Sequence, residues 1–487
     1  MSTRRSLVLS ALDRYSAFFV NLISTIVLSR ILTPDEIGVF SVTMAFLAFL
    51  QTMRDFGAGQ YLVQEKQLDR AKIQAVWTIQ LTIGLSLAIL IFLSRGVIAD
   101  FYKDPRIEAI LVVVALNFAI NPVGAITYAW LIREMKFGPL AVMRFSSSVI
   151  GAIVTIVLAW RGFGAISLAW GSVASTVVSA LVSMALRPSD MPWLPGLSGL
   201  RAIMKFGTQA TSISILNTLS RSAPDLFLGK LQNMAAVGLY SRGNGFVAMF
   251  ERLVLDAVWT VTMPMFAKIS REHGNLGPIY TKATAYLAAV TWSFTLGLAF
   301  LGEPLIRLLY GEQWLTSSSV AVLLAVTIAV QAPSFLCAHV LLGHGRNDLN
   351  LRVTAWTTIL RVPGLLVGAH FGLLAAAGST IPSAAIATAI WIAMVAKTVV
   401  VDWRTFLDQM IRSAMVAICA GIGPAMLNIS GLTSTLQPIV VVLAGVVTSG
   451  IGFVVAVYLT NHPLHDETVN VLNRLRHLRK RLTNLSG

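Results

Sequence analysis

Long apolar runs alternate with short polar segments along almost the whole chain. Most runs extend over about 20 residues, the length that an α-helix needs to cross the hydrocarbon core of a bilayer. Membrane-spanning strands would instead give segments of about 10 residues that alternate between apolar and polar positions, a pattern that the sequence lacks. We therefore predict an all-α polytopic membrane protein with about 14 transmembrane helices, near residues 7–29, 37–53, 75–94, 108–132, 140–160, 164–186, 206–227, 236–265, 281–301, 317–343, 353–369, 372–397, 412–430 and 438–460.

The composition excludes a soluble protein. Only 12% of the 487 residues are charged and 56% are hydrophobic, whereas soluble domains carry about 25% charged residues. The net charge of +15 resides mostly in short loops, where membrane topology requires it, so it does not indicate a nucleic-acid partner. The cysteines, Cys337 and Cys419, lie far apart in apolar runs, and no Cys/His spacing resembles a metal site. We expect no disulfide, metal or cofactor.

The distribution of basic residues predicts the orientation. With the N-terminus in the cytoplasm, the even-numbered loops and both tails hold 25 of the 37 Lys and Arg residues, including Arg54, Arg133 and Lys268. The odd-numbered loops then hold seven. This positive-inside bias places both termini in the cytoplasm. The loops are short, which leaves no room for a catalytic domain outside the membrane.

An internal repeat relates the two halves of the chain. The segment 37–41, Ile-Gly-Val-Phe-Ser, recurs at an offset of 200 as Val-Gly-Leu-Tyr-Ser at 237–241. The pair Phe163-Gly164 recurs as Phe371-Gly372 at an offset of 208, and Arg144 has its counterpart in Arg352 at the same offset. Three matches at similar offsets indicate a duplication of six spans.

The duplication predicts the domain organisation: an N-terminal six-helix lobe at 1–199, a second six-helix lobe at 200–400, two additional transmembrane helices at 401–460 and a tail at 461–487. Because six is an even number, both lobes enter the membrane in the same orientation, as in transporters with parallel repeats. Such transporters bind substrate between their halves and rock one against the other. The repeat therefore favours transport over a scaffolding role.

Several segments resemble a known family. The sequence Ser-Arg-Ile-Leu-Thr-Pro-Asp-Glu-Ile-Gly at 29–38 resembles the turn after the first span of polysaccharide transporters, also called oligosaccharide flippases. The segments 54–57 (Arg-Asp-Phe-Gly), 133–137 (Arg-Glu-Met-Lys-Phe) and 238–241, together with Asp225, resemble later stretches of the same family. The similarity covers about residues 1–400, and the chain looks most like transporters for exopolysaccharides of the succinoglycan kind.

The resemblance implies a fold and a function. The family belongs to the superfamily of multidrug, oligosaccharidyl-lipid and polysaccharide exporters, whose members have two six-helix lobes, here with two extra helices. It implies flipping of undecaprenyl-pyrophosphate-linked oligosaccharide repeat units across the bacterial inner membrane, from the cytoplasmic to the periplasmic leaflet, by alternating access. The substrate would serve exopolysaccharide or lipopolysaccharide biosynthesis. The resemblance implies no enzymatic activity.

Arginines inside the spans are the first candidates for binding such a substrate. A charge at the centre of a membrane helix costs about 2.5 kcal/mol or more, so it needs a functional or structural reason. Arginine also matches phosphate oxygens with two parallel hydrogen bonds. Five arginines lie within predicted spans and away from their cytoplasmic ends, and they are expected to line a cationic cavity: Arg14, Arg221, Arg242, Arg252 and Arg361.

Local acids separate these arginines into groups. Arg221 precedes Asp225 by four residues, and Arg252 precedes Asp256 by four, a spacing that permits an ion pair on one helix face. Arg361 and Arg14 have no acid at helical spacing, which leaves substrate contact or a distant salt bridge. Arg242 lies near the outer interface, where it can also extend its charge toward water.

Acidic residues in the spans leave two roles open. Each is a candidate for binding a coupling proton or sodium ion, and each is also a candidate for compensating an arginine: Asp13, Asp225, Glu251 and Asp256. Single polar residues such as Gln80 and Asn117 can bond sugar hydroxyls, but such residues more often tie helices together.

The expected partners follow from the substrate and from the tail. The tail carries leucines at helical spacing among basic residues, so it predicts an amphipathic helix on the anionic lipids of the inner leaflet. A polysaccharide polymerase or export complex is a further candidate partner. Two alternatives within the superfamily stay open. A peptidoglycan-precursor (lipid II) flippase would also use arginines, and a multidrug exporter would line its cavity with acids.

Overall fold

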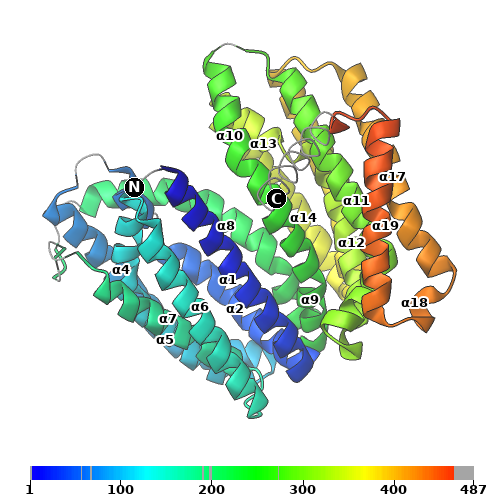
Figure 1. Ribbon diagram of the computed structural model, residues 1–487. Helices are drawn as coiled ribbons and strands as arrows, with labels where there is room; N and C mark the ends of the chain where they lie inside the picture. Colours follow the sequence, from blue (N-terminus) through cyan, green and yellow to red (C-terminus); the bar gives the residue numbers. More distant parts are fainter. Residues whose placement is uncertain are drawn as a thin grey trace, which may run out of the picture. The chain divides into compact units, whose positions relative to one another are not determined.

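A computed structural model describes residues 3–55, 58–65, 68–188, 191–192, 194–196, 200–272 and 274–465. Side chains are not described at 3–15, 17, 55, 58, 60, 200–213 and 434. Within these ranges the regular structure is helical (Figure 1). The helices of the first half are α1 (Thr3–Ile31), α2 (Pro34–Asp55), α3 (Ala58–Gln64), α4 (Arg70–Tyr102), α5 (Arg106–Arg133), α6 (Phe137–Trp160), α7 (Ile166–Ala185) and α8 (Leu200–Leu231).

The second half contains several helices that are broken into shorter elements. They are α9 (Met234–Phe250), the π-helical turn η1 (Glu251–Leu255), α10 (Asp256–Arg271), α11 (Gly277–Leu309), η2 (Glu312–Trp314), α12 (Thr316–Gln331), η3 (Ala332–Ser334), α13 (Cys337–Gly343), α14 (Asn347–His370), α15 (Leu373–Gly378), α16 (Thr380–Thr398), α17 (Trp403–Ile429), α18 (Leu432–Thr435) and α19 (Pro438–Leu459).

Every predicted span coincides with one long helix or with one run of consecutive helices. The eighth span corresponds to α9, η1 and α10 together, the tenth to α12, η3 and α13, and the twelfth to α15 and α16. In the described ranges, ten of these segments are long and apolar enough to cross a membrane. The prediction of a polytopic all-α protein is therefore confirmed. The predicted tail helix lies outside the described residues, because description ends at His465.

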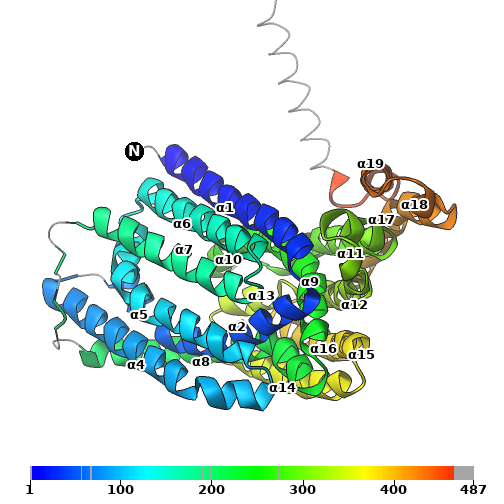
Figure 2. The ribbon, with the colours of Figure 1, turned by 90° about the horizontal axis from the view of Figure 1, so that it is seen from below.

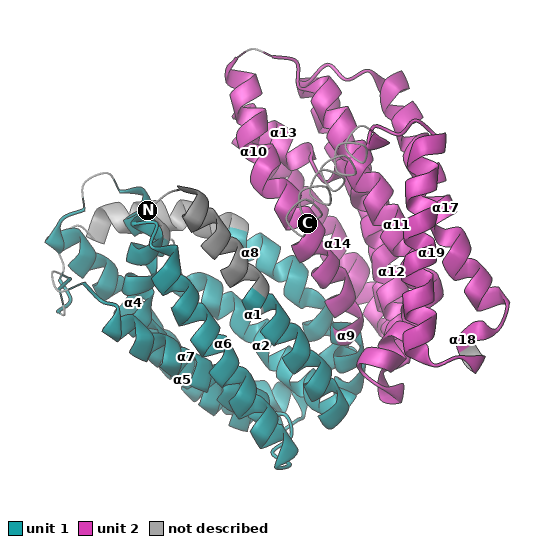
Figure 3. Ribbon diagram, viewed as in Figure 1, with its two compact units in different colours: residues 1–241 teal, residues 242–487 magenta. Residues whose placement is uncertain are grey.

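The chain divides into two compact units, residues 1–241 and 242–487 (Figure 3). In the first unit α7 packs against α6 and α5, α4 packs against α5, and α1 packs against α6. The neighbouring positions of α1, α6 and α7 are visible in Figures 1 and 2. The unit also contains α8, which packs against α2 and α4. These units follow compactness and not the repeat, so the lobe boundary at 199/200 stays a prediction.

The second unit is built around α11. This helix packs against α12, α17 and α19, and α17 and α19 pack against each other. A second group joins α12 and α14 to α16, and α10 to α13. The two C-terminal spans that the sequence predicts as additions, α17 and α19, are thus packed on the helix at the centre of this unit.

The two copies of the repeated turn meet inside the first unit. The Ser41 and Ser241 hydroxyls, 200 residues apart, are 3.3 Å from each other. A Cβ atom at Gly38 would lie 1.7 Å from the carbonyl oxygen of Met234, and one at Gly238 would lie 1.9 Å from that of Pro34. Only glycine permits this reciprocal approach of α2 and α9.

Local capping explains the repeated turn. In the first copy, Thr33 and Glu36 form a capping box, with the Thr33 N–H donating to the Glu36 carboxylate at 2.8 Å and the Glu36 N–H donating to the Thr33 hydroxyl at 3.3 Å. Pro34 occupies the first position of α2, where its missing N–H has no helical partner to lose. In the second copy, the Asn233 side chain accepts from the Ala236 N–H at 2.8 Å. Both turns are therefore fixed by side-chain caps at equivalent positions.

Candidate functional site

The nine charged candidates lie on α1, α8, the α9–η1–α10 run and α14. These segments are not among the ten that are long and apolar enough, over their described residues, to cross a membrane. Arg14 and Asp13 lie in α1, but their side chains are outside the described part of the chain. Their proposed roles therefore stay predictions.

The two ion pairs considered at four-residue spacing do not form among the described residues. Arg221 is exposed and Asp225 half-buried, with no ion pair between them. The Tyr102 hydroxyl donates to the carbonyl of Leu226, the residue that follows Asp225, at 3.4 Å. Arg252 and Asp256 are likewise unpaired within the described ranges.

The π-helical turn η1 explains why Arg252 and Asp256 do not form an ion pair. Residues four apart share a face in an α-helix. At η1, however, the Asp256 N–H bonds back to the Glu251 carbonyl, five residues earlier, so the backbone winds differently there. Glu251 itself is half-buried.

The remaining two arginines are held in different surroundings. The Arg242 guanidinium carbon lies 5.8 Å from the Tyr310 ring centre and 5.4 Å from that of Trp314, within the range of cation–π attraction. Its Nε atom is buried and has no hydrogen-bond partner among the described residues. Arg361 is half-buried on α14 and makes no ion pair within the part of the chain that is described.

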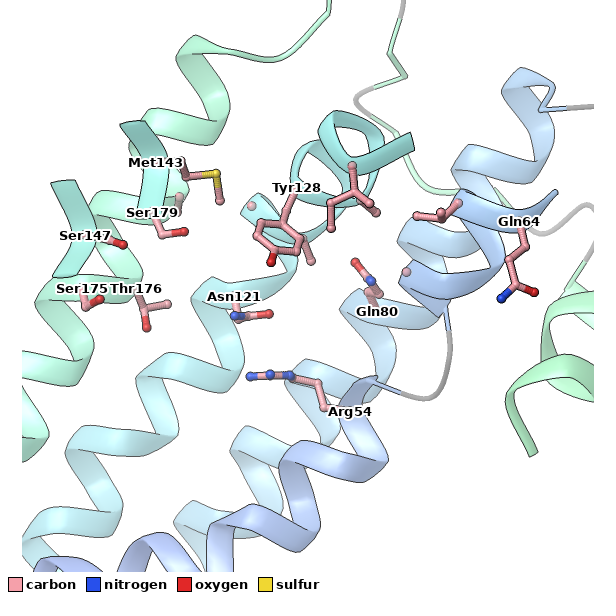
Figure 4. A pocket seen from close by; sticks show the side chains of 17 residues that line it. Arg54, Gln64, Gln80, Asn121, Tyr128, Met143, Ser147, Ser175, Thr176 and Ser179 are labelled. Carbon is pink, nitrogen blue, oxygen red and sulfur yellow. The ribbon is translucent and has the colours of Figure 1, made fainter. Parts of the chain in front are cut away.

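A cavity of about 660 Å³ lies inside the first unit. Its walls come from α2, α3, α4, α5, α6 and α7. In Figure 4, Arg54 and Gln80 lie on one side and Ser147, Ser175 and Ser179 on the other. Pockets that hold small-molecule ligands have volumes of about 300–1,000 Å³. The cavity is therefore of a size suited to a ligand.

Helical periodicity explains how the cavity acquires its walls. On α5 the lining positions are 121, 124, 125, 128, 129 and 132, which fall on one helix face. On α7 the lining positions are 175, 176, 179 and 180, again one face. One side of each helix is thus turned toward the cavity.

Several polar groups on these walls have no hydrogen-bond partner among the described residues. They are the amides of Gln80 and Asn121 and the hydroxyls of Ser175 and Ser179. Gln80 is only 8% exposed. Serine hydroxyls in helices usually bond to a carbonyl one turn earlier, as Thr176 does to Ser172 at 3.0 Å. The partnerless groups are available to a ligand.

The charge of the cavity is one-sided. Among the described residues that line it, Arg54, in the last turn of α2, is the one with a charge and none is acidic. The Arg54 guanidinium carbon lies 5.4 Å from the Phe118 ring centre. The Tyr128 hydroxyl accepts a hydrogen bond from Arg144. Such walls suit a ligand that is rich in hydroxyl groups and neutral or negatively charged.

Sequence reasoning found only part of this cavity. It named Gln80 as a polar residue able to bond sugars, and it treated Arg54 only as a marker of the cytoplasmic side. It missed Asn121, Tyr128 and the serines of α7. A signal was present, because serine or threonine stands at positions 172, 175, 176, 179 and 183, a polar face on an otherwise apolar span.

The fold is shared by a class of solved membrane proteins that includes a flippase and a multidrug transporter. A lipid II flippase MurJ structure matches with a TM-score of 0.73 at 14% identity, covering 93% of this chain and 99% of that one. An inward-facing multidrug transporter of the MATE family matches with a TM-score of 0.59 at 16% identity, covering 83% and 98% of the two chains. At these identities the likeness establishes the fold alone.

The sequence defines the family within that class. The chain belongs to the polysaccharide biosynthesis protein family, which it matches over residues 27–319. A succinoglycan biosynthesis transport protein, ExoT of Rhizobium meliloti (strain 1021), is 24% identical over 369 residues, 75% of this chain and 73% of ExoT. The lipopolysaccharide biosynthesis protein WzxC of Escherichia coli (strain K12) is 22% identical over 360 residues, 72% of this chain and 71% of WzxC. The resemblance inferred from the sequence motifs is confirmed.

Proposed function

We propose that this protein is a flippase of the bacterial inner membrane. It moves undecaprenyl-pyrophosphate-linked oligosaccharide repeat units from the cytoplasmic to the periplasmic leaflet, for exopolysaccharide or lipopolysaccharide biosynthesis. The family match over residues 27–319 carries the proposal. It is supported by relatives named for succinoglycan transport and for lipopolysaccharide biosynthesis.

The chemistry of the chain fits such a substrate. A sugar headgroup with a pyrophosphate must cross about 30 Å of hydrocarbon, while its polyprenyl tail can stay in lipid. The arginines of α8, α9, η1 and α14 would attract the pyrophosphate: Arg221, Arg242, Arg252 and Arg361. Asp225, Glu251 and Asp256 would compensate these charges or bind a coupling ion, and Asp13 and Arg14 on α1 would act with them.

The acid-free cavity favours this substrate over a cationic drug. A site for cations would need carboxylates, and the lining residues that the structure describes include Arg54 and no acid. The role is one of transport without a chemical step. Both termini would face the cytoplasm, because the basic loops lie on that side. The basic tail at 461–487 would contact anionic lipids, and a polymerase or export complex would receive the product.

The test asks which leaflet holds the lipid-linked oligosaccharide. Spheroplasts with and without the protein are treated with an impermeant sugar-oxidising reagent, and the lipid-linked pool is analysed by mass spectrometry. We expect the pool to be oxidised when the protein is present and shielded when it is absent. Equal oxidation in both cases would refute the proposal.

A second measurement separates the lipid II alternative. Depletion of a peptidoglycan-precursor flippase stops cell-wall synthesis, so it should cause lysis. Depletion of an exopolysaccharide flippase should leave growing cells intact. Lysis on depletion, rescued by a known lipid II flippase, would move the substrate assignment to the peptidoglycan precursor.

A further inference from the structure

The cavity of the first unit, defined by its lining residues Arg54, Gln80, Asn121, Tyr128, Ser175 and Ser179, has the chemistry of a carbohydrate site. Its walls offer amide and hydroxyl groups that can both donate and accept hydrogen bonds, as sugar hydroxyls do. They also offer an aromatic ring, whose apolar face can pack against the C–H groups of a sugar ring.

Gln80 is the group that most needs a ligand. Its side chain is 8% exposed, and its Oε1 atom is buried without a hydrogen-bond partner in the described part of the chain. A buried polar atom left unpaired lowers stability, so sequences retain one mainly where something else satisfies it. Figure 4 shows the Gln80 amide directed toward the space that Asn121 and Tyr128 also face.

A neighbouring asparagine on α5 lies outside the cavity and bonds to another helix through its Nδ2 atom, although its Oδ1 atom, like Gln80 Oε1, is buried without a partner among the described residues. Asn117 lies one turn before Asn121 on α5, and its Nδ2 donates to the Ser172 hydroxyl of α7 at 2.9 Å. That bond ties two helices together. Asn117 does not line the cavity, whereas Asn121 lines it and has no partner among the described residues. The two asparagines form a matched pair for experiment.

The depth of the cavity suits a headgroup that enters from the cytoplasm. Gln80 lies ten residues after Arg70, the first residue of α4, or roughly 15 Å from that helix end at about 1.5 Å per residue. Arg54 stands in the last turn of α2. Both helix ends border the basic segment between α2 and α4, which the sequence predicts to be cytoplasmic. The cavity therefore extends from that side to about the middle of the membrane.

We propose that this cavity is a binding subsite for one sugar residue of the lipid-linked headgroup, neutral or acidic, whose hydroxyls are bound by Gln80 and Asn121. The inference rests on the proposed function and adds to it a place where the sugar, apart from the pyrophosphate, is recognised. Arg54 makes the subsite more favourable for an acidic sugar than for a cationic one.

The binding test uses two lipid probes on the full chain in nanodiscs. One is the undecaprenyl-pyrophosphate-linked repeat unit extracted from producing cells, and the other is undecaprenyl pyrophosphate without sugar. Binding is followed by intrinsic tryptophan fluorescence. We expect the sugar-bearing lipid to bind more tightly to the wild-type protein, and Gln80→Leu or Asn121→Leu to weaken it about tenfold. The affinity for the sugar-free lipid should not change.

Stability and the matched control distinguish a subsite from a structural role. Gln80→Leu removes an unsatisfied buried atom, so its thermal unfolding temperature should equal or exceed that of the wild type. Asn117→Leu breaks a helix–helix hydrogen bond, so it should lower the unfolding temperature and keep the preference for the sugar-bearing lipid. Ser179→Ala, a smaller change on α7, should lower the affinity for the sugar-bearing lipid by a factor of a few.

The outcomes separate this inference from the proposed function. If the wild type flips the lipid in spheroplasts and Gln80→Leu and Asn121→Leu flip and bind it equally well, the subsite is refuted and the flippase stands. If the wild type neither flips nor prefers the sugar-bearing lipid, the proposed function fails first. Loss of the preference in both cavity variants, with Asn117→Leu unaffected, supports the subsite.

Discussion

Polar side chains on helices of equal length have different surroundings in the two units. Helices α4 and α11 each have 33 residues, α5 and the run Thr316–Gly343 each have 28, and α6 and α14 each have 24. In the second unit, the Tyr280 hydroxyl donates to the Pro333 carbonyl at 3.1 Å, and the Trp292 indole donates to that of Ala329 at 2.8 Å. In the first unit, Gln80 and Asn121 face a cavity instead.

The difference shows what separates a structural polar residue from a binding one. In the second unit, the Tyr280 hydroxyl and the Trp292 indole of α11 bond to backbone carbonyls of the neighbouring run, and α17 and α19 cover the same helix. In the first unit, the cavity-facing amides of Gln80 and Asn121 have no such partner among the described residues. Identity alone does not predict the role, because the role depends on whether the fold supplies a partner.

The largest expected effect comes from emptying the packed interior of the second unit. Tyr280 is fully buried, with 0% exposure. Tyr280→Ala should lower the free energy of unfolding by about 3–5 kcal/mol, as large-to-small core substitutions do. Flipping per folded molecule should stay unchanged. Thermal unfolding and the spheroplast assay, normalised to folded protein, measure the two effects.

Tyr280→Phe is the matched control. It keeps the ring and removes only the hydroxyl, so the loss should be about 1 kcal/mol. If Tyr280→Ala left the unfolding temperature unchanged and abolished flipping, the assignment of this interior to a structural role would be wrong.

The second prediction concerns the repeated turn of the first unit, where α2 and α9 approach each other closely. A Cβ atom at Gly238 would lie 1.9 Å from the Pro34 carbonyl oxygen. Gly238→Ala should therefore force a backbone shift and lower the free energy of unfolding by about 1–3 kcal/mol. Such a loss would show that the repeated turn tolerates an added side chain as poorly as the packed interior of the second unit tolerates a lost one. Differential scanning calorimetry of the purified variant measures the loss of stability.

A glycine on the same helix supplies the control. Gly245 also lies on α9, and a Cβ atom there would meet nothing within 4 Å. Gly245→Ala should raise stability by about 0.5–1 kcal/mol, because alanine loses less chain entropy in a helix. Equal changes in the free energy of unfolding at both positions would show that the close approach at Gly238 does not affect stability.

The sequence predicted the fold far better than the site. Fourteen spans could be located because the hydrocarbon thickness imposes about 20 apolar residues on each, and the repeat was visible in the glycine, aromatic and serine positions of two turns. The π-helical turn at Glu251–Leu255 was not foreseeable from periodicity, since it depends on tertiary packing. The ion pairs that α-helical spacing permits at Arg221 and Arg252 are absent among the described residues.

Arg54 shows why the cavity was harder to predict. Its position at the end of a span fits the positive-inside rule, and that topological reason hid a second role. Whether its side chain turns toward lipid, water or a cavity depends on how α2, α4 and α5 pack. For Asn117 and Asn121, two asparagines one turn apart, only the position of α7 decides which one finds a partner.

The smallest expected effect is a difference in acid sensitivity between the units. In the second unit, burial, with a smaller contribution from Arg412, lowers the pKa of His462 to about 4. Its Nε2 lies 2.9 Å from the Ser413 hydroxyl. In the first unit, the hydrogen bond from Arg106 lowers the pKa of Asp104. The two groups should therefore destabilise their units in different pH ranges.

The sign follows from which state binds more protons. His462 has an ordinary pKa near 6.5 when unfolded, so between about 6.5 and 4 the unfolded chain takes up a proton that the folded chain does not. Folding is then weakened as the pH falls through that window, by on the order of 1 kcal/mol after allowance for solvent screening. The contribution of Asp104 to stability is present above its unfolded pKa of about 3.9 and is lost only below it.

Hydrogen exchange of α17 and α19, corrected for the intrinsic rate, should increase between pH 6.5 and 4 while that of α4 and α5 stays constant. His462→Gln should abolish the pH response, and a response that persists in this variant would assign the acid sensitivity to another group.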